Sequence, residues 1–320
     1  MTMAAATMIL AGCSNDENDP VDNWNGEIRL TSGVTTQTRA NTQATQIQNG
    51  ETVYAWADKA SSTPDHIKAW TLTAGSGNNF TGTSQYYPTD GSNLDFYALH
   101  GNFKEATFTE NTTKFPTTAI VHSVEADQSG TDMKAYAKSD LLYAVQKGVA
   151  RSSNAVQLPF YHILSKVEVA LKSGNGNPDL AGATVTIVGT QLKADFTPGK
   201  DVTMTEQSAR AGMIAINGSD NDAAPITIRT VTTDNLDSNT EYGEAVVLPK
   251  QTINAKTAFI QVKLSNNAVF TYKIPDGEPL TLESGKKYTY KITVNQSGLT
   301  VTSKIDDWTS EVKTGNAEMD

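Results

Sequence analysis

Polar and apolar residues alternate over short stretches along most of this chain, with a period of two residues. The first such stretch is 26–34, where Ile28 and Leu30 alternate with polar neighbours, which is typical of a half-buried strand. No stretch keeps the apolar period of a helix, although residues 124–133 are compatible with a short helix or an irregular excursion. The pattern therefore predicts an all-β protein.

Further strands are predicted wherever a short apolar or alternating run lies between turn-forming residues. Gly, Asn and Pro separate these runs, as in the segment 74–79, and this spacing is typical of β-sandwiches. The predicted strands cover residues 52–56, 67–73, 94–100, 141–145, 155–160, 164–172, 183–189, 191–196, 245–248, 258–264, 269–274, 288–294 and 299–305.

The length of 320 residues is sufficient for two domains, because single hydrophobic cores usually stop growing below this size. The segment 147–154 is small and polar, so it is predicted to link the two. We therefore expect one β-sandwich domain over residues 26–150 and another over 151–320.

Composition narrows the range of functions. The 25 Lys and Arg residues against 35 Asp and Glu give a net charge of −10, which disfavours nucleic acid as a partner. The single cysteine excludes an intramolecular disulfide, and the four histidines lack metal-ligand spacing, so no metal or cofactor is predicted. The histidines are His66, His100, His122 and His162.

The amino terminus resembles the export signal of a bacterial lipoprotein. Residues 3–12 form an apolar run too short to span a membrane, and the tetrad Leu10-Ala11-Gly12-Cys13 resembles a lipobox. Residues 1–12 are therefore predicted to be a signal peptide, with Cys13 carrying the lipid. No Lys or Arg precedes the apolar run, which leaves open a start codon further upstream.

An acidic segment follows Cys13. Residues 14–20 are polar, acidic and end in Pro20, so residues 13–25 are predicted to form an extended tether. The segment is similar to the signal that directs lipoproteins of Bacteroidota to the outer face of the outer membrane, and a plain solvated linker is the alternative.

A polar loop is predicted directly after the first strand. Residues 35–51 lack periodicity and contain a single basic residue, Arg39, followed by Ala40. A trypsin-like protease cuts such a loop without unfolding the rest.

Several short patterns, in order along the chain, together resemble the fimbrillins, the subunits of type V pili of Bacteroidota. Each pattern alone is compatible with ordinary strand packing, but their order after a lipobox is specific. They are Thr-Arg-Ala at 38–40, Tyr-Tyr-Pro at 86–88, Leu-Asp-Phe-Tyr-Ala at 94–98, Asp-Leu-Leu-Tyr-Ala at 140–144, the run 156–167, Val-Val-Leu-Pro-Lys-Gln-Thr at 246–252, the run 285–292 and Ile-Asp-Asp-Trp at 305–308.

The resemblance implies two transthyretin-like β-sandwich domains in a lipid-anchored subunit of the outer membrane and cell surface. It also implies that an arginine-specific protease cuts between Arg39 and Ala40, which removes the strand carrying Ile28 and Leu30. A strand from another pilin subunit then fills the vacated groove by strand addition. A host protein or glycan receptor is a further expected partner.

The carboxyl end leaves two roles open. After Trp308 only Val312 alternates with polar residues, which makes a poor donor strand. The chain is then either a tip or accessory subunit, or 299–305 is itself the donated strand.

Motifs of the common enzyme classes are absent from the sequence, so no catalytic residue and no enzyme activity are predicted. Asp306 and Asp307 are adjacent on a predicted strand and point to opposite faces, so they cannot flank one glycosidic bond. The main alternative function is a surface lipoprotein that binds glycans through exposed aromatic rings at Trp70, Tyr86 or Tyr87.

Overall fold

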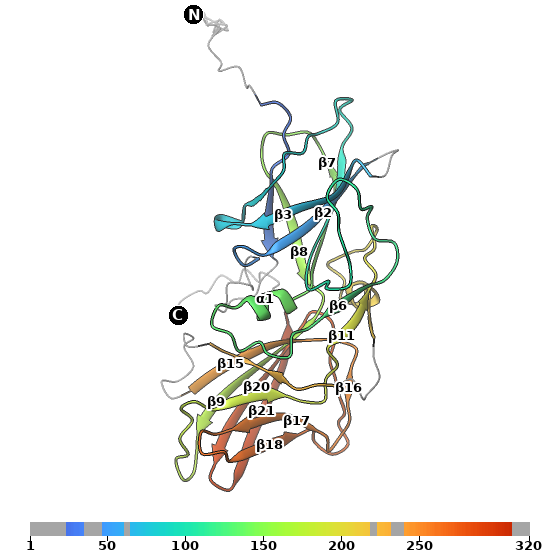
Figure 1. The fold of residues 1–320 in the computed structure, drawn as a ribbon. Helices are drawn as coiled ribbons and strands as arrows, with labels where there is room; N and C mark the ends of the chain where they lie inside the picture. Colours follow the sequence, from blue (N-terminus) through green and yellow to red (C-terminus); the bar gives the residue numbers. More distant parts are fainter. Residues whose placement is uncertain (1–23, 35–46, 61–64, 218–222, 232–239, 309–320) are drawn as a thin grey trace, which may run out of the picture.

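The computed structural model describes residues 24–34, 47–60, 65–217, 223–231 and 240–308 (Figure 1). These residues form strands in several sheets, with two short α-helices, α1 (Lys134–Ser139) and α2 (Gln207–Gly212), and one 3-10 turn, η2 (Ser76–Asn78). The all-β fold class predicted from the alternation is confirmed.

Seven strands form the sheet of the amino-terminal half. The first strand pairs parallel with its neighbour, and all other pairs in this sheet are antiparallel. The order across the sheet is β1 (Leu30–Val34), β8 (Val156–His162), β7 (Leu142–Val149), β5 (Leu94–His100), β2 (Thr52–Lys59), β3 (Ile67–Ala74) and β4 (Phe80–Gly82).

The carboxyl-terminal half contains a five-stranded sheet, a four-stranded sheet and smaller pairings, which lie below the first sheet in Figure 1. The five-stranded sheet has the order β14 (Arg229–Val231), β15 (Thr240–Val247), β9 (Ser165–Ser173), β20 (Lys286–Asn295) and β21 (Gly298–Asp307). The four-stranded sheet has the order β13 (Ile226–Thr227), β10 (Thr184–Ile187), β17 (Ala258–Lys263) and β18 (Val269–Lys273). The smaller sheets are β12 (Ile214–Ile216), β11 (Lys193–Phe196) and β6 (Ile120–Ser123), and β16 (Thr252–Ile253) with β19 (Leu280–Thr281).

The amino-terminal sheet is buried on both faces. In β5, Phe96 and Ala98 point into a smaller core that also contains β1, whereas Tyr97 and Leu99 point into the large core shared with the carboxyl-terminal sheets. Successive side chains of a strand alternate between faces, so this one strand contributes to both cores. The smaller core is the one that positions the candidate site.

The segment 147–154, predicted as an interdomain linker, instead comprises the end of β7 and most of the turn to its neighbour β8 in the same sheet. β7 ends at Val149, β8 begins at Val156, and the two strands pair antiparallel. Small polar residues occur in turns between strands as well as in interdomain linkers, so composition alone could not distinguish a turn from a linker. The division into domains at residue 150 remains a prediction, and it would separate β8 from its own sheet.

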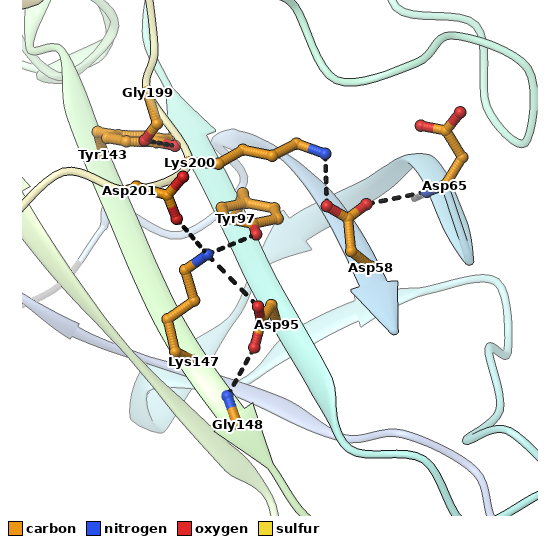
Figure 2. A network of polar contacts seen from close by, with 10 residues as sticks. All are labelled: Asp58, Asp65, Asp95, Tyr97, Tyr143, Lys147, Gly148, Gly199, Lys200 and Asp201. Atoms are coloured by element: carbon orange, nitrogen blue, oxygen red, sulfur yellow. Dashed lines mark hydrogen bonds and ion pairs between the residues drawn. The ribbon is translucent and has the colours of Figure 1, made fainter. Parts of the chain in front are cut away.

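A network of polar contacts ties the two halves together (Figure 2). The Lys147 Nζ atom of β7 lies 2.9 Å from the Tyr97 hydroxyl and 3.1 Å from a carboxylate oxygen of Asp201. Asp201 belongs to the loop after β11. The neighbouring Lys200 pairs with Asp58 of β2. The loop after β11 is thereby held against β7, β5 and β2, the central strands of the amino-terminal sheet, by charge-assisted hydrogen bonds.

Candidate strand-exchange site

The backbone of β1 lies between two other segments. On one side β1 runs parallel to β8, in a register from Leu30 opposite Val156 to Val34 opposite Phe160. On the other side, the segment 79–87 approaches antiparallel. The first and last strands in the sheet order, β1 and β4, are also in contact. β1 is therefore inserted into the sheet rather than laid over a finished one.

The contacts with residues 79–87 are backbone hydrogen bonds and bridges. The Ile28 amide donates to the Gln85 carbonyl at 2.7 Å, and the Tyr87 amide donates to the Gly26 carbonyl at 3.0 Å. A single bridge joins Thr31 to Asn79 further along the strand. These isolated hydrogen bonds hold the segment less firmly than the continuous ladder to β8 does, because fewer backbone groups are paired.

The side chains of this segment alternate as the sequence predicts. Ile28 and Leu30 are each 3% exposed and Val34 is 6% exposed, and all three belong to the smaller core with Phe160. Burial of such a side chain is worth about 1.5–3 kcal/mol. The prediction of a half-buried strand is confirmed for Leu30, which begins β1, whereas Ile28 is buried as predicted but precedes the strand. Their exchange for another strand is not tested by the structure.

The regular ladder begins later than predicted. The alternation suggested a strand over 26–34, but continuous pairing starts at Leu30 and the earlier residues make an isolated bridge at Glu27. Gly26 has φ +88°, in the left-handed region that favours glycine. The backbone turns there, which shortens the extended segment.

Trp24 is a residue of the site that sequence reasoning missed, because it was included in the predicted tether over 13–25. In the structure its indole Nε1 donates to the Glu27 carbonyl at 2.9 Å, and the ring packs on Tyr87. The available signal was a large aromatic residue in an otherwise polar stretch, since exposing such a ring is unfavourable.

A model of the fimbrillin-like family matches residues 38–308 of the chain. The chain belongs to the fimbrillin-like family. This confirms the resemblance drawn from the ordered motifs, and it supports a role as a fimbrial or cell-adhesion subunit.

Individual relatives agree with this assignment. Among curated proteins, the fimbrillin-like chain is 25% identical to a candidate fimbrium subunit, Fim1C, of Bacteroides uniformis, over 98% of this chain and 96% of the relative. Among solved structures, a candidate cell adhesion protein of Bacteroides uniformis has a TM-score of 0.58 at 20% identity and covers 89% of this chain and 98% of its own. A candidate cell adhesion protein of Bacteroides ovatus has a TM-score of 0.60 at 17% identity, with coverage of 89% and 98%. At these identities the structures show a shared fold.

Three predicted site residues of the fimbrillin-like chain, Cys13, Arg39 and Ala40, lie outside the described residues. Lipidation at Cys13 and cutting between Arg39 and Ala40 therefore remain predictions. Arg39 follows the last residue of β1, Val34, by five positions, so a cut there leaves the whole strand on the amino-terminal fragment. Within the described residues, no helix is long and apolar enough to cross a membrane.

The aromatic residues proposed for the glycan-binding alternative do not share an exposed face. Trp70 and Tyr87 are both buried at 4% exposure, and only Tyr86 is substantially exposed, at 47%. A stacking platform needs exposed rings, so the prediction that any of these three serves as one is wrong for Trp70 and Tyr87.

Two buried histidines of the fimbrillin-like chain, His100 and His122, have a hydrogen-bond partner at both ring nitrogens. His122 Nδ1 accepts from the Asn102 amide at 3.2 Å, and Nε2 lies 2.9 Å from the Ser139 carbonyl. Burial lowers the pKa of His122 to about 4, because desolvation disfavours the charged ring. Among the described residues no group of three or more His, Cys, Asp or Glu is arranged to hold a metal ion.

Proposed function

We propose that this fimbrillin-like chain is a non-catalytic, structural subunit of a cell-surface fimbrium, and that it joins other subunits by exchanging β1 for a strand from a neighbour. The observation that carries the proposal is the insertion of β1 between β8 and residues 79–87, with Ile28, Leu30 and Val34 in the smaller core. This short segment completes the sheet, and its removal would expose both an unpaired edge and apolar pockets.

Strand addition suits such a site physically. An incoming extended segment pairs its backbone with the free edge of β8, and its alternate side chains fill the pockets. A donated strand with apolar residues in the same register would regain most of what β1 contributes. Exchange is then close to neutral in free energy, while a groove left empty is an aggregation-prone edge.

A cut after Arg39 would change the balance between the two strands. In the uncut chain, β1 is tethered to its own groove and benefits from a high effective concentration. Once residues 1–39 are a separate fragment, β1 binds as a second molecule and can be displaced. We propose that export through lipidated Cys13 at the outer membrane precedes this cut, so the uncut subunit stays monomeric.

The position of the subunit within the fimbrium is proposed from β21, the last strand that the structure describes. β21 pairs with β20 over ten residues, from Gly298 to Asp307, and detaching it would break that ladder. This supports a tip or accessory subunit that accepts a strand without donating one. Donation of 299–305 is the competing assignment.

Digestion of the purified chain with an arginine-specific protease tests the proposal. We expect a new amino terminus at Ala40 by mass spectrometry, and release of the fragment that ends at Arg39 when an excess of a peptide of residues 24–39 is added to the cut chain. The Arg39→Gln variant serves as the matched control: it should stay uncut at this position and should not take up the peptide. A chain that is cut at Arg39 and keeps its own fragment against this excess would contradict the exchange mechanism.

A further inference from the structure

The segment that precedes β1 ends in an aromatic contact on the body of the protein. The Trp24 ring lies 5.1 Å from the guanidinium carbon of Arg151, and its centroid is 6.0 Å from that of Tyr87 in an edge-to-face arrangement. Arg151 comes from the turn between β7 and β8, and Tyr87 from the segment that flanks β1. Both of these residues lie after Arg39 and stay with the body when the chain is cut.

The backbone around Trp24 is shaped for this contact. Gly26 faces Arg151 closely, since a Cβ at residue 26 would lie 2.9 Å from the Arg151 Nη2 atom. With φ +88° at Gly26, the chain turns from the aromatic contact into the extended segment that leads through Ile28 to β1. The Glu27 carboxylate accepts a hydrogen bond from Ser84, which fixes the same turn against the wall of the groove.

The positions after Trp24 define a second requirement. Ile28, Leu30 and Val34 fill apolar pockets, whereas Ser32, at the alternate position between Leu30 and Val34, is also buried at 2% exposure. A buried position occupied by serine leaves little volume for a larger side chain, because protein interiors are closely packed. The groove therefore distinguishes apolar positions from one small position.

We infer that the space between Arg151 and Tyr87 is an aromatic subsite at one end of the β1 groove, and that the strand donated by another subunit places an aromatic side chain there. The inference rests on the proposed strand exchange. A cation over a ring face and an edge-to-face aromatic pair both favour an aromatic occupant over an aliphatic one. The matching donor has an aromatic residue four positions before its first apolar residue, followed by apolar, apolar, small and apolar residues at alternate positions.

Peptide exchange on the cut chain tests this subsite. The protein is cut at Arg39 with its own fragment left in place, and a fluorescent peptide of residues 24–39 is added as the displacing strand. Anisotropy then gives the apparent affinity of each peptide. We expect the peptide with Trp24→Ala to bind about tenfold or more weakly, while a peptide with Arg29→Ala, which changes an exposed residue, binds as the unmodified one.

A cycle with the body isolates the contact. Arg151→Ala should weaken the unmodified peptide severalfold and should leave the Trp24→Ala peptide almost unchanged, because the partner ring is already absent. Peptides that exchange readily but bind equally with and without Trp24 overturn the aromatic subsite alone. No exchange of any peptide overturns the subsite together with the proposed function. If Arg151→Ala does not fold, the comparison of the two peptides on the unmodified body still decides.

Discussion

The first and the last described strands, β1 and β21, complete their sheets in opposite ways. β1 has five residues with a strictly alternating pattern of buried and half-buried positions. β21 has ten residues that are all exposed or half-buried, with Ile305 at 56% exposure. The short strand is therefore held mainly by its side chains in pockets, and the long one mainly by its backbone ladder to β20.

This difference indicates how each strand can be replaced. A strand held by pockets is specific, because an incoming segment must present apolar groups in the same register. A strand held by a long ladder is less selective for side chains and is costly to detach in one step. Under the proposed strand exchange, the groove of β1 would therefore accept a strand, and β21 would be an unfavourable donor.

The largest expected effect comes from emptying one pocket of the groove. Leu30→Ala should lower the free energy of unfolding by about 2–5 kcal/mol, because it leaves a cavity in a packed core. Ile305→Ala in β21 should change it by less than about 0.5 kcal/mol. Urea denaturation of both variants measures the difference. Similar losses in the two strands would contradict the contrast between pockets and ladder.

Acid should weaken the body of the protein through one buried histidine. The pKa of His122 is about 4 in the folded chain, against about 6.5 when unfolded. The unfolded chain therefore takes up the proton first as the pH falls. The stability that the neutral His122 contributes is fully present above about pH 6.5. It is lost as the pH falls from about 6.5 through 4, by about 3 kcal/mol in all.

Denaturation across this pH range, with His122→Gln as the comparison, isolates the contribution of the histidine. The variant should show a flatter dependence of stability on pH. An identical slope in both proteins would assign the acid sensitivity to other groups.

The smallest expected effect concerns the polar network of Figure 2. Lys147 is 40% exposed in its side chain and its partner Asp201 is 93% exposed, so the pair is well screened by solvent. Lys147→Met should cost no more than about 1 kcal/mol, and less at high salt. Lys291→Met, at another exposed strand lysine, should be close to neutral. A loss of stability above about 2 kcal/mol would show that this polar network contributes as much as a pocket of the β1 groove.

Local alternation predicted the long strands because burial on a sheet follows a period of two. The strand over 94–100 matches β5 in both bounds, and Ile28 and Leu30 were assigned to the buried face. Short strands such as β6 and β12 were missed, because three or four residues carry little periodicity and pair only when a distant partner is present. The helix compatible with 124–133 lies instead at 134–139, where the left-handed Met133 precedes it without a capping side chain.

The candidate site could be predicted only in part, for the same reason. The pockets for Ile28 and Leu30 follow from their own segment, so the pattern of that segment was sufficient. The contact of Trp24 depends on Arg151 and Tyr87, which are far away in the sequence and brought together by the sheet. No local pattern near Trp24 encodes that contact.

Hydrogen exchange measured residue by residue on the chain cut at Arg39 tests most directly whether β1 can leave a folded body. We expect the amides of Thr31 to Val34 in β1 to exchange through a local opening, much faster than those of Tyr97 to Leu99 in β5, which open only on global unfolding. Equal exchange rates in the two strands, both following global unfolding, would show that β1 is an inseparable part of the core and that it cannot be exchanged for another strand.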